Sequence, residues 1–126
     1  ISLIISTHEI QEVMPWLDQI IVLQEGRLIQ NESPRDIYSN PYNAYVAKLF
    51  GEVNVFSDEE KAAFGLSKNF WYPNEIKISH SGKEARILES RFAGNHYWNK
   101  VLVSGKELTI YSETQLSGES AVHFAD

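Results

Sequence analysis

The chain has 126 residues, of which 43% are hydrophobic and 12% aromatic, enough for a hydrophobic core, so global disorder is excluded. Its net charge of −6 is spread over both halves: Lys and Arg number 3 against 7 acidic residues up to Phe56, and 8 against 10 beyond it. This balance argues against a phosphate-backbone partner, and the absence of cysteine excludes a disulfide framework.

The sequence shows neither a membrane-spanning run nor a signal peptide. No apolar stretch approaches the roughly 20 residues that cross a bilayer. The apolar run Ile1–Ile5 lacks a basic lead and a small-residue cleavage site. Since the chain starts with Ile and not with Met, we interpret it as a fragment of a cytoplasmic protein.

The first half predicts a strand, a helix and a hairpin. Ile1–Ser6 is almost continuous Ile and Leu, typical of a strand buried on both faces of a parallel sheet. A short helix is expected over residues 9–16. Residues 18–24 and 27–30 are rich in apolar and β-branched residues, and Gly26 between them supplies the positive φ of a tight hairpin turn.

Two further helices and a linker follow the hairpin. Ser33 is expected to cap a helix that has Pro34 at its first position and ends at Ser39. Residues 43–50 carry a helical apolar stripe that ends at Gly51. Residues 54–69 are predicted to form a linker that holds one helical turn.

The second half changes to the pattern of an all-β domain. Short β-rich runs are separated by turn signals every 8 to 12 residues, which predicts a small antiparallel barrel or sandwich. The expected strands cover residues 70–72, 83–92, 95–103, 107–111 and 120–124.

The opening residues resemble the last stretch of the ATPase domain of importer-type ABC transporters. That family shows a strand, Thr-His-Asp, a helix with a glutamate, an Asp before a strand, and a hairpin Gly. The corresponding positions here are Thr7-His8-Glu9, Glu12, Asp18 and Gly26, and the match continues through Ser33-Pro34, Tyr38, Asn40-Pro41, Val46-Ala47 and Phe50-Gly51. The sequence departs from the pattern at Glu9, Gln19 and Glu32, where Asp, Arg and Gly are common.

The resemblance implies a catalytic role for His8 in the full-length parent. In this family the switch histidine contacts the γ-phosphate of ATP and positions the attacking water. ATP and Mg would be bound by the parent, and no phosphate loop G-x-x-x-x-G-K-[ST] occurs in this chain. We therefore expect the fragment alone to have no cofactor and no ATPase activity. A histidine that merely packs or caps is the alternative for His8.

The second half resembles a transport-associated OB (TOBE) domain. The resemblance is carried by Tyr72-Pro73-Asn74-Glu75-Ile76 and by residues 90–97, with Tyr72 where the family often has Arg. It implies packing against the counterpart in a second ATPase subunit and, in some members, binding of regulatory ligands. The candidate regulatory surface is Arg91, Asn95, His96 and Tyr97. The alternative is that these four residues shape a strand junction and face water.

The resulting fold class is α+β: the C-terminal end of a P-loop ATPase α/β domain at residues 1–56, a linker at 57–69, and an OB-like barrel at 70–126. The parent would be a homodimer that couples ATP hydrolysis to solute import through a permease at the inner face of the membrane. The fragment would be a regulatory or dimerisation module that self-associates through Ile1–Ser6, whose edge would be exposed. Sugars, polyamines, ferric iron and oxyanions all fit as transported substrates.

The rival interpretation is a stand-alone OB-like interaction module, or one that binds single-stranded nucleic acid by stacking bases on Phe92, Tyr97 and Trp98. The acidic charge favours placing these aromatics in the core and argues against a nucleic-acid partner. A metal site is not expected, because the four histidines lack ligand spacing and no cysteine is present.

Overall fold

The computed structural model describes residues 10–125 and divides the chain into two compact units, Ile1–Gly51 and Glu52–Asp126. The strand predicted over Ile1–Ser6 and the catalytic residue predicted at His8 lie outside the described residues.

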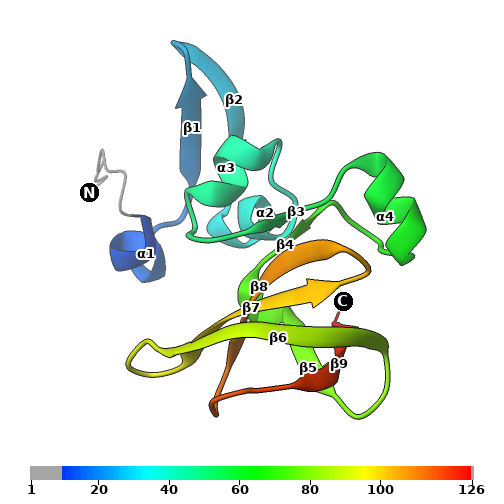
Figure 1. The fold of residues 1–126 in the computed structure, drawn as a ribbon. Helices are drawn as coiled ribbons and strands as arrows, with labels where there is room; N and C mark the ends of the chain where they lie inside the picture. The colour runs from blue at the N-terminus through cyan, green and yellow to red at the C-terminus, as the bar shows by residue number, and fades with distance from the viewer. Residues whose placement is uncertain (1–9, 126) are drawn as a thin grey trace. The chain divides into compact units, whose positions relative to one another are not determined.

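The first unit is built on a two-stranded antiparallel hairpin with short helices (Figure 1). Strands β1 and β2 meet in a turn where Glu25 has a φ of 52° and Gly26 a φ of 75°, the two positive values of a type I′ turn. The predicted hairpin is thus confirmed. The elements are α1 Ile10–Val13, the 3₁₀ helix η1 Met14–Trp16, β1 Ile20–Gln24, β2 Arg27–Glu32, α2 Pro34–Ser39 and α3 Ala44–Lys48.

Side-chain caps start the two helices that follow the hairpin. The Ser33 hydroxyl accepts from the amide of Asp36 at 3.3 Å, and Asn43 Oδ1 accepts from the amide of Val46 at 3.0 Å. Both helices lie where the sequence predicts them. The buried apolar residues of these helices and of the hairpin are Ile20, Val22, Ile37, Val46, Ala47 and Phe50.

The second unit is a curled five-stranded antiparallel half-barrel, consistent with an OB-like fold (Figure 1). Its strand order is β5-β9-β6-β7-β8, so the last strand is inserted between the first two, while β6, β7 and β8 follow one another as a meander. A separate two-stranded sheet joins β3 and β4. The elements are β3 Asn54–Val55, α4 Asp58–Phe64, β4 Phe70–Trp71, η2 Pro73–Glu75, β5 Ile76–Ser79, β6 Lys83–Phe92, β7 Tyr97–Val103, β8 Lys106–Ser112 and β9 Glu119–Phe124.

Alternating residues of the strands fill the core of this unit. On β7 and β8 every second side chain is buried, which is the period-2 pattern of a sheet with one covered face. Aromatic rings close the core, with Phe124 edge-on to Phe56 and to Trp71 at centroid distances of 5.9 and 5.2 Å. The buried cluster comprises Phe56, Trp71, Ile76, Ala85, Val101, Val103, Leu108, Ile110 and Val122.

Two sequence-based expectations about the barrel are wrong. Phe92, Tyr97 and Trp98 were expected in the core, but Phe92 is 73% exposed and the other two are half-buried. Strand β5 was not expected at all, although Ile76 and Ile78 alternate with polar residues as a half-buried strand requires.

Between residues 10 and 125, none of the helices is long and apolar enough to cross a membrane.

Candidate functional site

The candidate regulatory surface lies at the turn between β6 and β7. The amide of Ala93 donates to the carbonyl of His96 at 2.9 Å and closes this turn. Asn95 Oδ1 lies 2.6 Å from His96 Nδ1, and the imidazole contacts the Tyr111 ring with centroids 4.2 Å apart and ring planes tilted by 41°. The structure therefore brings Asn95 and His96 together, and it adds Tyr111 from β8, which the sequence analysis did not single out.

Tyr97 and Arg91 take part in separate contacts. The Tyr97 ring is edge-on to the exposed Phe92, with centroids 5.5 Å apart. Arg91 is exposed and pairs with Glu89 on its own strand at 3.1 Å. An exposed ion pair of this kind contributes little to stability. The four predicted residues thus do not converge on one point, and only the Asn95–His96 pair forms a direct contact.

A second group on the outer face of the sheet was missed from the sequence. Strand pairing places Trp98 opposite both Arg91 and Tyr111. The Trp98 indole Nε1 donates to Glu52 Oε2 at 2.9 Å, and the Lys100 ammonium lies 5.9 Å from the centroid of the Trp98 ring. Glu52 is 46 positions away along the chain, so no local pattern could have predicted this contact.

The environment of Tyr111 changes its acidity. Partial burial raises the pKa of the Tyr111 phenol above its ordinary value, and the negative charge of Glu52 adds to this rise. The phenol therefore stays protonated through the physiological pH range. It can act as a hydrogen-bond donor, but it is not a base at neutral pH.

A buried amide lies beneath this region and holds the strands together. Asn99 has no exposed surface, and its Nδ2 lies within 3.2 Å of the carbonyls of Tyr97 and Ile110 and 2.9 Å from Ser112 Oγ. These contacts join β7 to β8 at the end of the barrel that carries the candidate surface. Hydrogen bonds from Asn99 thus hold the two strands together beside the turn, while its Oδ1 is buried without a hydrogen-bond partner.

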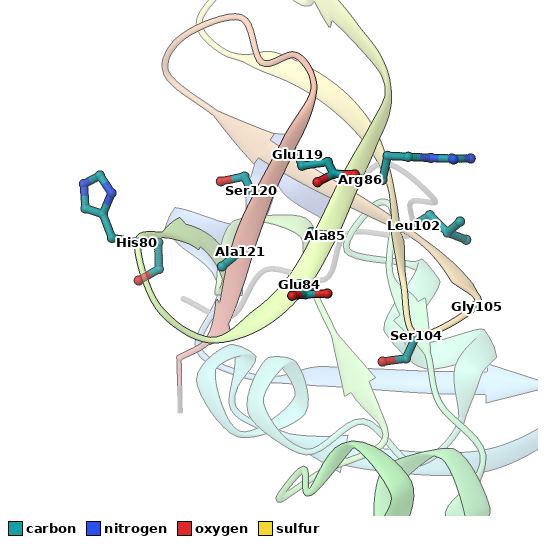
Figure 2. A pocket seen from close by; sticks show the side chains of 11 residues that line it. His80, Glu84, Ala85, Arg86, Leu102, Ser104, Gly105, Glu119, Ser120 and Ala121 are labelled. Carbon is teal, nitrogen blue, oxygen red and sulfur yellow. The ribbon is translucent and has the colours of Figure 1, made fainter.

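The described residues also line an open cavity of about 580 Å³ on the barrel (Figure 2). Glu84 and Arg86 come from β6, Glu119 from β9, and His80 from the loop after β5. In Figure 2, His80 and Arg86 lie at opposite ends of the group and point away from each other. The charges are mixed and do not converge, so the cavity is not a built site for an ion of either sign.

Within residues 10–125, no three His, Asp or Glu side chains are close enough to hold a metal ion. His8 lies outside the described residues. Of the predicted site residues, the structure therefore places the four at the barrel turn.

No protein-family model matches the chain. Curated proteins do match it. The spermidine/putrescine import ATP-binding protein PotA of Vibrio cholerae is 36% identical over 98 residues, which cover 70% of this chain and 25% of that protein. The proteins of the same name from Pasteurella multocida and Mannheimia succiniciproducens are each 46% identical, over 57 and 56 residues.

These two shorter matches cover 45% and 44% of this chain and 15% of each relative. The chain thus spans a quarter or less of the length of these curated relatives. The match confirms the family indicated by the resemblance of the opening residues, and the half-barrel is consistent with the OB-like domain expected after them. The homologues of this chain are thus import ATP-binding proteins, and one of them matches 70% of its length.

Proposed function

We propose that this chain is the C-terminal part of an ATP-binding subunit that drives uptake of polyamines through a membrane permease. The observation that carries the proposal is the 36% identity over 98 residues to a spermidine/putrescine import ATP-binding protein. Of the substrates that the sequence left open, polyamines are the class named for these relatives. The subunit would lie at the inner face of the membrane, held there by the permease.

In this proposal residues 1–56 are the end of the ATPase domain. One face of the hairpin supports this assignment, because Ile21, Leu23 and Leu28 are each 58–59% exposed although they are large and apolar. A two-stranded hairpin is only marginally stable by itself. A larger α/β domain would cover these side chains, as the wider ATPase domain of the parent would do.

In this proposal ATP and Mg are bound by the parent, because the sequence has no phosphate loop G-x-x-x-x-G-K-[ST]. Phosphate binding requires backbone amides or cations around the phosphate oxygens. The cavity of the barrel is lined by Glu84 and Glu119 and has a single arginine, so it does not fit a triphosphate. His8 would supply one contact, a hydrogen bond from its imidazole to the γ-phosphate, as the family resemblance implies.

The barrel, residues 70–126, would act in regulation and in dimerisation of the ATPase subunits, with residues 57–69 as the linker. The candidate surface around Asn95 and His96 supports this role, since a firmly held turn carries it. The isolated chain would also self-associate through Ile1–Ser6. Sedimentation equilibrium over a concentration series tests the self-association, and Leu3→Lys should shift the chain towards monomer. A monomer at all concentrations would contradict it.

The proposed function is tested in the complete transporter, with the upstream part of the subunit and the permease in liposomes. Labelled spermidine should be taken up in the presence of Mg-ATP, and His8→Ala should abolish both uptake and ATP hydrolysis while ATP binding persists. His123→Ala, which changes an exposed histidine on β9, is the matched control and should retain both activities. ATP hydrolysis unchanged by His8→Ala would refute the role of His8, and ATP-driven uptake of another solute class alone would refute the substrate assignment.

A further inference from the structure

The chain passes from the first compact unit to the second between Gly51 and Glu52. Phe50 is 3% exposed and packs edge-on against Tyr38 with ring centroids 5.4 Å apart. The amides of Leu49, Phe50 and Gly51 each donate to a carbonyl three residues back, at 3.1–3.2 Å. These bonds continue the helical hydrogen bonding of the main chain up to Gly51.

Gly51 itself adopts a backbone conformation that other residues avoid. Its φ is 121°, in a region where an L side chain is strained and glycine is not. Glycine also has the widest range of accessible backbone angles, so it can absorb a change of chain direction at low cost. The junction therefore carries a residue suited to be a pivot at the place where the first unit ends.

On the barrel side of the junction, two side chains hold the main chain in place, those of Asn54 and Glu52. Asn54 is anchored to the barrel, because its side chain exchanges hydrogen bonds with Thr109 N and O at 2.7 and 2.8 Å and donates to Trp71 O at 3.1 Å. Two residues earlier, Glu52 Oε2 accepts the hydrogen bond from Trp98 Nε1 at 2.9 Å. The influence of Glu52 on the pKa of Tyr111 agrees with this position of the carboxylate.

We propose that Gly51 is the pivot between the two units and that the Glu52–Trp98 hydrogen bond is a latch that keeps the barrel side of the junction rigid up to this pivot. If the latch is absent, the segment that can rotate extends over three residues, Gly51–Val53. When this hydrogen bond is formed, only the backbone dihedral angles at Gly51 can change the direction of the chain. Each additional free residue enlarges the accessible conformations, so the latch narrows the range of orientations that the two units can sample.

This inference does not depend on the proposed transport function, because the latch and the pivot can be tested in the chain as it is. The measurement is ¹⁵N backbone relaxation of the 126-residue chain. In the wild type, the amides of Glu52 and Val53 should have order parameters like those of the barrel strands, about 0.85. In Glu52→Ala and Trp98→Phe, both order parameters should fall below about 0.6, the range of flexible backbone.

Matched variants separate the latch from general damage. Glu52→Gln keeps an acceptor oxygen and should preserve the order of both amides, whereas Glu84→Ala removes a carboxylate elsewhere on the barrel and should have no effect on them. The amides of Asn54 and Thr109 serve as an internal check that the barrel remains folded.

Three results would overturn the proposal. One is that residues 52 and 53 of the wild type are already as mobile as a free loop. Another is that Trp98→Phe and Glu52→Ala leave both order parameters unchanged. The third is that Glu52→Gln loses as much order as Glu52→Ala, which would show that the hydrogen bond to the indole is not the cause.

Discussion

Among the polar residues described in the barrel, replacement of Asn54 should lower the free energy of unfolding most. Its side chain is 7% exposed and makes three hydrogen bonds that join β3 to β4 and to β8, across 17 and 55 positions of the chain. Asn54→Ala removes all three and leaves the amide and carbonyl of Thr109 without these partners. Hydrogen bonds of this kind contribute about 1 kcal/mol each, so the free energy of unfolding should fall by about 3 kcal/mol.

A loss of this size is large for this unit. At about 0.1 kcal/mol per residue, a unit of this length has a free energy of unfolding of about 5–10 kcal/mol. With a urea m-value of about 1–1.5 kcal/mol/M, the midpoint of unfolding should fall by about 2–3 M urea. Tryptophan fluorescence in a Trp16→Phe background measures this, because the remaining indoles, Trp71 and Trp98, both belong to the second unit.

Two further variants test the reasoning. Asn74→Ala changes an exposed asparagine of the same unit and should alter the free energy of unfolding by less than about 0.5 kcal/mol. Asn54→Asp keeps one acceptor but places a carboxylate against two carbonyl oxygens, so its pKa should be raised in the folded state. Its stability should therefore be lowest at neutral pH and recover as the pH falls through that raised pKa. An Asn54→Asp protein as stable as the wild type at pH 7 would refute the role of the two donated bonds.

Three further predictions concern the turns and caps. A Cβ on Gly82 would lie 2.3 Å from the carbonyl oxygen of Val122, so Gly82→Ala should lower the free energy of unfolding by about 2–4 kcal/mol. Gly105→Ala is the control, because its added Cβ meets no atom within 4 Å. A smaller fall in melting temperature for Gly82→Ala than for Gly105→Ala would contradict this prediction. The hydrogen bond from the Ser57 amide, and then the contact with Lys106, lower the pKa of Glu60 in the folded protein. The resulting stabilisation is present above the ordinary pKa of a glutamate and is lost as the pH falls through the lowered pKa of the folded state. A pH titration of the melting temperature should therefore show a weaker acid dependence in Glu60→Gln than in the wild type. Asn43→Ala removes the cap of α3 and the hydrogen bond from Asn43 Nδ2 to Gln24 Oε1. The free energy of unfolding, measured with urea, should fall by about 1 kcal/mol. Asn43→Ser, which keeps a capping oxygen, should recover most of that loss.

Local signals predicted most of the elements but not their assembly. The Glu25-Gly26 turn, the Ser33 cap and the limits of β6 depend on neighbours in the sequence, and the structure has them where they were expected. Helix α4 was expected as a single turn in a linker, yet it runs over Asp58–Phe64 with a full capping box between Ser57 and Glu60. That Ser-x-x-Glu signal was present in the sequence.

The insertion of β9 between β5 and β6 could not be predicted in the same way. Its pairing partners lie about 35 to 50 positions earlier in the chain, and the alternating pattern of a strand does not say which neighbour it pairs with. The same holds for the contact between Glu52 and Trp98. Both depend on pairing across the unit, which a pattern within one segment does not encode.

An irregularity in β6 determines which face of the sheet Glu89 and Arg91 occupy. Ala85 and Ile87 of β6 face the core, and strict alternation would turn Glu89 and Arg91 inward as well. The pairing of β6 with β7 shifts by one residue between Ile87 and Glu89. Such a bulge reverses the faces of all residues beyond it.

Beyond the bulge, Arg91 therefore shares the outer face with Trp98 and Tyr111, while Phe92 pairs with Tyr97 at the open end of the inner face. This explains why the aromatic residues expected in the core are partly exposed. Trp98 faces outward because Asn99, Val101 and Val103 of its own strand are buried, and on the outer face its indole reaches Glu52. Deleting Leu88, the extra residue of the bulge, should restore regular alternation after Ile87 and leave Arg91 opposite Trp98 on the outer face. The outer-face group and the latch at Glu52 should therefore persist in this deletion variant, and an Arg91 that turns inward would contradict the assignment of Leu88 as the extra residue.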